Sequence, residues 1–103
     1  MRAVRRKGVE FSQGVIEAAY KRANGVDQIT GEPLEHPTEV DHILPVAWAL
    51  LNAPDIPPSI LASGHNARVV NQKTHKERHR NCDEAEAWEM VAKFRALQDV
   101  LLE

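Results

Sequence analysis

The chain contains 103 residues, of which 43% are apolar and 27% charged. This length allows one domain and leaves no room for a second core, and the composition is that of a globular protein. No apolar run approaches the ~20 residues of a membrane-spanning helix, and no hydrophobic stretch follows the basic N-terminal residues as in a secretory signal. The single cysteine, Cys82, excludes a disulfide within the chain. We therefore expect a cytoplasmic protein that does not associate with membranes.

The formal net charge of −2 conceals an uneven distribution. Residues 1–22 and residues 65–80 each carry a net charge of +4, whereas residues 23–64 carry −6 and residues 83–103 carry −4. Two basic segments could form one electropositive face suited to the phosphates of a nucleic acid. A solvated surface of mixed charge explains the same distribution equally well.

The first predicted element is a helix over residues 11–23. Its apolar side chains recur at helical spacing, Ser12 is a suitable N-cap, and Asn24 and Gly25 supply a left-handed stop. Glycine and proline then prevent any long regular element over residues 27–37.

Two short strands are predicted next, over residues 38–43 and 66–71. A brief helix at residues 46–53 and a proline-rich loop at residues 54–59 separate them. A short basic helix over residues 73–80 follows the second strand.

The last predicted element is a helix over residues 84–102, with acidic side chains in its first turn. It carries an apolar stripe that we expect to face the core or a dimer interface: Trp88, Val91, Phe94, Leu97 and Leu101. The order of elements predicts the α+β fold class in a single domain.

Five polar residues form the most informative pattern: Asp41 and His42 at the end of the first strand, Asn66 at the start of the second, and His75 and His79 on the short helix. The two helical imidazoles, four residues apart, share one face and could bind one divalent ion together with the Asp41 carboxylate. His42 is then left free, and an imidazole with a pKa near ~6.5 suits a general base. Asn66 could orient the His42 ring or hold the intervening loop.

The run "VDHILP" followed by Asn66, His75 and His79 resembles the HNH endonuclease family, whose fold is the small ββα-metal (His-Me finger) core. The resemblance covers residues 39–80 well and residues 11–34 loosely. It implies a single nuclease domain over residues 1–103, with residues 11–23 and 84–102 as flanking helices.

Carried onto this sequence, the resemblance makes His42 the general base and Asn66 the catalytic asparagine that orients it. It makes Asp41, His75 and His79 the ligands of one divalent metal ion. Asp41 stands where colicin-type members have histidine, so a hard carboxylate oxygen replaces an imidazole nitrogen in the predicted ligand set. We expect Mg²⁺ or Mn²⁺ as the cofactor, with Ni²⁺ and Zn²⁺ as alternatives.

A second difference from the family pattern, besides Asp41 in place of histidine, concerns the stability of the fold. Many family members brace this fold with two cysteine pairs around a structural zinc. The corresponding positions in this chain hold Asp27, Thr30, Asn71 and Thr74. We therefore expect packing of the flanking helices to replace the contribution of the zinc.

Basic side chains surround the predicted site. We expect several of them to contact DNA phosphates, which carry no information on base sequence: Arg68, Lys73, Lys76, Arg78 and Arg80. The alternative for these residues is a solvated helix face on which Glu77 pairs locally with one of them.

These expectations together predict a metal-dependent HNH endonuclease that hydrolyses DNA phosphodiester bonds, and the resemblance implies 5′-phosphate and 3′-hydroxyl products. One site per chain would nick one strand, and a homodimer could cut both. The expected partners are DNA, bound with weak sequence specificity, and a targeting protein such as those of phage packaging. Two other interpretations are a non-catalytic DNA-binding module of the same fold and a structural metal site. Neither of them requires the free base His42.

Overall fold

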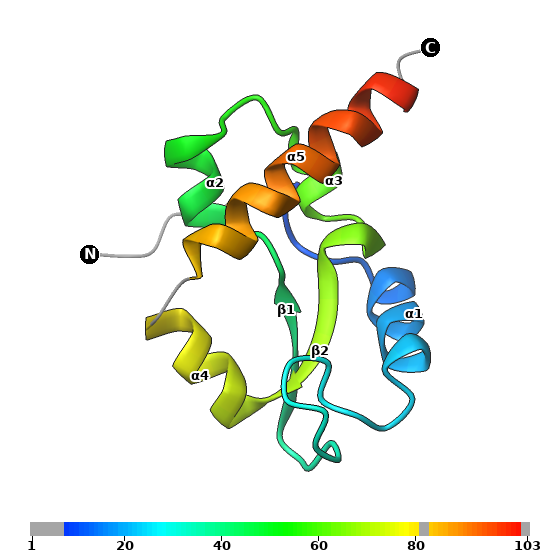
Figure 1. Ribbon diagram of the computed structural model, residues 1–103. Helices are drawn as coiled ribbons and strands as arrows, with labels where there is room; N and C mark the ends of the chain where they lie inside the picture. The colour runs from blue at the N-terminus through cyan, green and yellow to red at the C-terminus, as the bar shows by residue number, and fades with distance from the viewer. Residues whose placement is uncertain (1–7, 81–82, 102–103) are drawn as a thin grey trace, which may run out of the picture.

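The computed structural model describes residues 8–80 and 83–101, with only the backbone described at residues 79, 80 and 101. The architecture is a small α+β fold, as predicted (Figure 1). None of the helices in the described ranges is both long and apolar enough to cross a membrane. The elements in chain order are α1 (Gln13–Ala23), β1 (Thr38–His42), α2 (Val46–Asn52), α3 (Pro58–Leu61), the 3₁₀ turn η1 (Gly64–Asn66), β2 (Ala67–Asn71), α4 (Gln72–Arg80) and α5 (Glu84–Leu101).

Helix α1 begins and ends where its sequence predicts. The Ser12 side chain accepts a hydrogen bond from the Val15 amide at 3.2 Å, which satisfies one of the free N–H groups of the first turn. Asn24 adopts the left-handed conformation, with φ 50° and ψ 46°, and ends the helix. The buried face of α1, with Ala19 and Ala23, packs against Ala67 and Val69 of β2.

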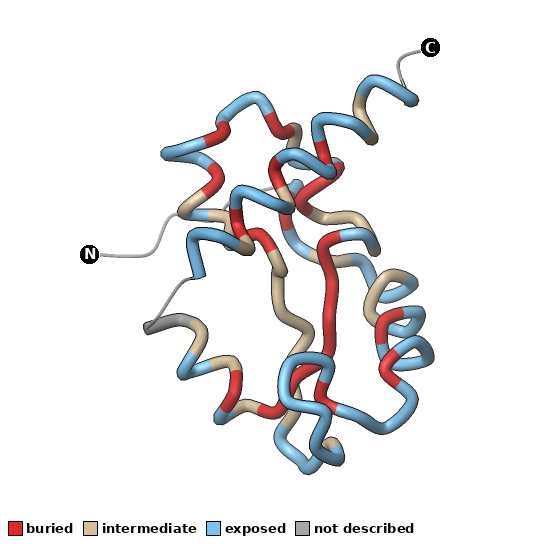
Figure 2. Tube along the Cα trace, in the orientation of Figure 1, coloured by how far each residue is buried: buried red, intermediate tan, exposed pale blue. Residues whose placement is uncertain are grey.

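Strands β1 and β2 form a two-stranded antiparallel sheet in which Asp41 lies opposite Arg68 and His42 lies opposite Ala67. Because neighbouring residues point to opposite faces, Asp41 and Arg68 share one face and His42 the other. Helix α1 lies beside β2, whereas α4 lies beside β1 and contacts both strands (Figure 1). All five residues of β2 are buried, and those of β1 are half-buried (Figure 2).

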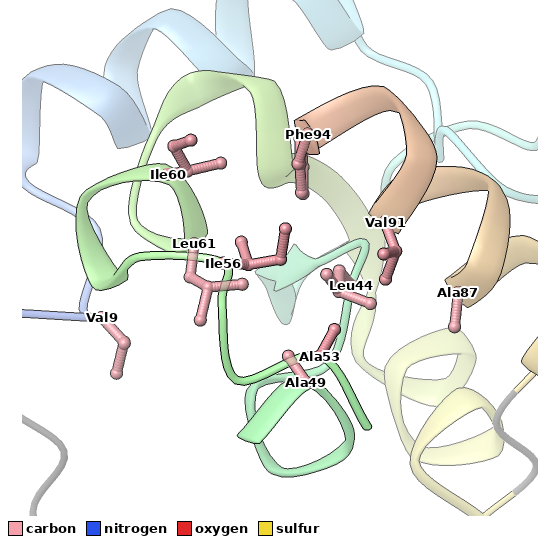
Figure 3. Packing of buried hydrophobic residues seen from close by; sticks show 10 residues of the cluster. All are labelled: Val9, Leu44, Ala49, Ala53, Ile56, Ile60, Leu61, Ala87, Val91 and Phe94. Atoms are coloured by element: carbon pink, nitrogen blue, oxygen red, sulfur yellow. The ribbon is translucent and has the colours of Figure 1, made fainter. Parts of the chain in front are cut away.

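The main hydrophobic core lies between the segment that joins the strands and helix α5. Figure 3 shows side chains from both elements gathered around Leu44, which is fully buried. Val91 and Phe94 of α5 are buried there, as the apolar stripe predicts. Trp88 does not join the core: it is 47% exposed and packs edge-to-face with Trp48, with ring centroids 5.0 Å apart. The alternative of a dimer interface for Trp88 stays a prediction. The side chain of Leu101, also assigned to this stripe, lies outside the described residues.

The segment between the strands is more ordered than its prolines suggest. Residues predicted as a loop lead into α3, in which Pro58 occupies the first helical position. Proline fits there because its missing N–H would have no helical partner. Ile60 and Leu61 of this short helix are buried in the core.

A hydrogen-bond cluster around one buried carboxylate joins the positions Asp27, Thr30, Asn71 and Thr74. Asp27 is fully buried, and its Oδ1 accepts bonds from the amides of Ile29 at 2.8 Å and Thr30 at 3.0 Å. Its Oδ2 accepts from the Asn71 amide at 2.9 Å and the Thr74 hydroxyl at 2.8 Å. One carboxylate thus ties the turn after α1 to β2 and α4. This stabilisation comes in addition to the helix packing that the sequence leads us to expect.

Candidate functional site

The structure brings two of the predicted metal ligands together. Asp41 lies near the end of β1 and His75 lies on the face of α4 that packs against the sheet, with Asp41 Oδ1 3.2 Å from His75 Nδ1. The other ring nitrogen, Nε2, lies 3.1 Å from Oε2 of Glu39, which is two residues before Asp41 and therefore on the same face of β1. The imidazole of His75 thus lies between two carboxylates.

His42 is held on the opposite face of β1 by residues that precede α1. Its Nε2–H donates a hydrogen bond of 2.8 Å to the Val9 carbonyl oxygen, which can only accept. Phe11 stacks on the ring, with centroids 4.1 Å apart and an angle of 20° between the planes. The neutral ring therefore carries its proton on Nε2, which leaves a lone pair on Nδ1.

The environment of His42 keeps its ring neutral. Burial disfavours the imidazolium and lowers the pKa of His42 below 6.5, and the positive charge of His75 acts in the same direction. The hydrogen bond to Val9 and the charge of Asp41 oppose this shift without reversing it. At neutral pH the ring is a proton acceptor.

Asp41, His42 and His75 share one pocket of about 190 Å³ at the outer edge of β1, where side chains of both faces of the strand meet. The pocket is lined by Asp41, His42, Pro45, Val46, Ala47, His75 and Arg78. Its polar groups include a carboxylate, two imidazoles and a guanidinium, which are suited to a cation and a phosphate.

The third predicted ligand, His79, lies on α4, but its side chain is outside the described part of the chain. Among the side chains that the structure does describe, no group of three or more His, Cys, Asp or Glu is arranged to hold a metal ion. The observed 3.2 Å between Asp41 Oδ1 and His75 Nδ1 is the length of an ion pair. Two adjacent ligands of one ion at ~2.1 Å in an octahedral site would lie about 3.0 Å apart, so the same pair could hold a cation with little movement.

Asn66 holds the loop after His42 and does not orient the His42 ring. Its Oδ1 accepts from the Leu44 amide at 2.7 Å, and its Nδ2 donates to the carbonyls of Leu44 at 3.2 Å and Leu61 at 3.0 Å. Both donors of the amide are therefore used by the backbone. Of the two roles considered for this asparagine, the geometry supports holding the loop.

The predicted DNA contacts fall into different environments. Arg68 is only 8% exposed, and its guanidinium pairs with Glu86 of α5. Because it is buried and already paired, Arg68 is poorly placed to contact a phosphate. Lys73 is exposed and lies 3.6 Å from Glu32. Lys76 is exposed, and Arg78 is half-buried against Glu86. The side chain of Arg80 is outside the described residues.

Three features of the site were not predicted from the sequence. Glu39 could have been suspected, since residues two apart on a strand share a face. The Val9 carbonyl that holds His42 and the pairing of Glu86 with two arginines join segments distant in the chain, and no local spacing indicates them.

In comparisons with known proteins, the chain matches no family model, no curated protein and no solved structure.

Proposed function

We propose that this protein is a metal-dependent endonuclease of the HNH family, with β1, β2 and α4 as a ββα-metal core, and that it hydrolyses phosphodiester bonds of DNA. The observation that carries the proposal is the shared pocket. An imidazole held neutral, His42, lies there beside a carboxylate–imidazole pair, Asp41 and His75. The two parts match the needs of phosphodiester hydrolysis, a base for water and a place for a cation.

In the proposed reaction, Nδ1 of His42 accepts a proton from the attacking water. The hydrogen bond to Val9 and the stacking of Phe11 fix the tautomer and direction of the ring, so that little reorganisation precedes proton transfer. Asp41 and His75 would hold the divalent ion, which when bound would supply positive charge to the transition state and the leaving oxygen. Arg78, in the pocket wall, binds a phosphate oxygen.

The decisive experiment incubates supercoiled plasmid with Mg²⁺, Mn²⁺, Ni²⁺ or Zn²⁺, and with chelator. Wild type is compared with His42→Ala and with His36→Ala, which changes an exposed histidine away from the site. We expect nicking by the wild type and by His36→Ala, its loss with chelator, and a decrease of about 10²–10⁴-fold for His42→Ala. Unchanged cleavage by His42→Ala would contradict the assignment of the base. A wild type that binds plasmid without cutting it with any of the four ions would favour a DNA-binding module.

The metal ligands are tested separately by titration calorimetry with Mn²⁺. Asp41→Ala and His75→Ala are expected to weaken binding by at least ten-fold, because each removes one proposed ligand of the ion. His42→Ala should leave the affinity nearly unchanged. Equal losses in all three variants would mean that His42 is itself a ligand. The variant His79→Ala tests the third ligand in the same assay.

A DNA partner is proposed on the same basis, with weak sequence specificity, since the expected contacts are to phosphates. Dimerisation and a targeting or packaging partner are further proposals, and a cytoplasmic location is proposed from the single cysteine. Light scattering with and without a short DNA duplex tests dimerisation, because a symmetric pair of chains on one duplex could cut both strands.

A further inference from the structure

Helix α5 lies outside the motif that resembles HNH nucleases, yet one of its side chains reaches the site. The carboxylate of Glu86 accepts two hydrogen bonds from Arg68, at 3.2 Å and 3.1 Å, through the two terminal nitrogens of the guanidinium. Its Oε1 also accepts a hydrogen bond from Arg78. One carboxylate on α5 therefore holds an arginine of β2 and an arginine of α4.

The pairing with Glu86 determines how Arg68 meets the candidate metal ligand Asp41. The two residues face each other across the sheet, and Asp41 Oδ2 lies 3.6 Å from Arg68 Nε, beyond the length of a good hydrogen bond. Both terminal nitrogens of Arg68 are directed to Glu86. Asp41 is thus ion-paired with Arg68 through Nε alone, and neither terminal nitrogen of Arg68 competes with a cation for the Asp41 carboxylate.

The same carboxylate places Arg78. This guanidinium lines the pocket that contains His42 and His75, and its contact with Glu86 limits the positions that its long side chain can adopt. An arginine held in this way can meet a phosphate oxygen with less loss of side-chain entropy than a free one. Burial raises the pKa of the Glu86 carboxyl, but the hydrogen bonds and charge of Arg68 and the charge of Arg78 outweigh burial and lower it. Glu86 therefore carries its full negative charge at neutral pH.

We infer that Glu86 is a positioning residue for the hydrolytic site: it keeps Arg68 from pairing closely with Asp41, and it presents Arg78 to the phosphate of the substrate. This inference rests on the proposed nuclease function. Without Glu86, Arg68 would turn to Asp41, its remaining acidic neighbour, and compete with the metal ion. Arg78 would lose its anchor in the pocket wall.

The test compares Glu86→Gln with Glu89→Gln, which removes the same charge from an exposed position one turn further along α5. Three quantities are measured: the affinity for Mn²⁺ by calorimetry, the affinity for a DNA duplex in chelator by fluorescence anisotropy, and kcat and KM for cleavage with Mn²⁺. For Glu86→Gln we expect Mn²⁺ affinity to fall at least three-fold and kcat to fall about ten-fold. DNA affinity should not fall, because removal of a negative charge favours phosphate binding in both variants.

Glu89→Gln should show the same small gain in DNA affinity with unchanged kcat and Mn²⁺ affinity. If Glu86→Gln behaves as Glu89→Gln does in all three measurements, the inference is overturned. If Glu86→Gln does not fold, Arg78→Gln, which leaves the pair of Arg68 and Glu86 intact, replaces it. That variant should lose kcat and keep its Mn²⁺ affinity, and a parallel loss of both would contradict the separate roles.

The outcomes also separate this inference from the proposed function. If the wild type binds Mn²⁺ but cuts no DNA, the nuclease proposal fails, and the Mn²⁺ affinities still test whether Glu86 keeps Asp41 available. If the wild type cuts DNA and Glu86→Gln cuts it equally well with equal Mn²⁺ affinity, the nuclease proposal stands and the role of Glu86 is refuted.

Discussion

Replacement of Asp27 by asparagine tests what stabilises this small domain. The Asp27 carboxylate is fully buried and accepts four hydrogen bonds, two on each oxygen. Asparagine has nearly the same shape but offers only one acceptor oxygen. Its amide N–H₂ group would face N–H or O–H donors in place of the second oxygen, which leaves at least one buried donor without an acceptor.

The pKa of Asp27 gives the magnitude of the expected loss. Burial alone would raise this pKa, but the hydrogen bonds from Asn71, Thr30, Thr74 and Ile29 outweigh burial and lower it from 3.8 to about 2. At 1.36 kcal/mol for each pKa unit, the ionised carboxylate stabilises the fold by about 2 kcal/mol at neutral pH. This is a large part of the roughly 5–15 kcal/mol that separates a folded domain from its unfolded chain.

The same pKa fixes how the effect varies with pH. Because the folded pKa lies below the unfolded one, the stabilisation is complete above pH about 4 and is lost as the pH falls toward about 2. Urea unfolding, followed by tryptophan fluorescence, should therefore show a loss of about 2 kcal/mol or more for Asp27→Asn at pH 7 and a smaller difference from wild type at pH 3. The control Asp55→Asn, which removes an exposed partner of Arg95, should lose less. Equal stability of Asp27→Asn and wild type at pH 7, or a difference that stays constant down to pH 3, would refute the reasoning.

Three further predictions follow from the core and the site. Asn66→Ala leaves the backbone groups of Leu44 and Leu61 without their side-chain partners and should lower the free energy of unfolding in urea by at least about 2 kcal/mol; a loss confined to cleavage would instead mean that Asn66 acts on the reaction. Phe94→Ala empties the centre of a core in which this ring is fully buried and should cost about 3–5 kcal/mol in the same measurement, whereas a cost below about 1 kcal/mol would show that the core is loosely packed. Cleavage should rise with pH to a plateau whose midpoint lies below 6.5, because the pKa of His42 is lowered and the base must be neutral; a midpoint above 6.5 would exclude His42 as that base.

The elements that were predicted correctly are those whose signals are local. Ser12 and Asn24 mark the ends of α1 by their own side chains and backbone preferences, and the alternation in residues 38–43 indicates β1. The meeting of Asp41 and His75 was also expected, because a carboxylate at the end of a strand and an imidazole on a following short helix were assigned to one site. Spacing along the chain is sufficient for such features.

The features that were not predicted depend on pairs of residues far apart in the chain. Arg68 was predicted to contact DNA phosphates, because its formal charge is visible in the sequence while its pairing with Glu86, 18 positions later, is not. Trp88 lies at the helical spacing of the core residues, yet it is 47% exposed and its ring packs with Trp48. The buried cluster of Asp27 likewise joins positions 44 and 47 residues apart.

The position of α5 has a consequence for attempts to transplant the candidate site. Residues 39–80 hold the strands, α4 and the candidate pocket, but Ala87, Val91 and Phe94 of α5 complete the hydrophobic interior around Leu44, and Glu86 pairs with Arg68 and Arg78. A fragment cut after residue 80 and fused to another scaffold would thus expose an apolar surface and remove the acidic partner that these two arginines share. A working minimal module has to extend through α5, or the recipient scaffold has to provide an acidic group and an apolar face in its place.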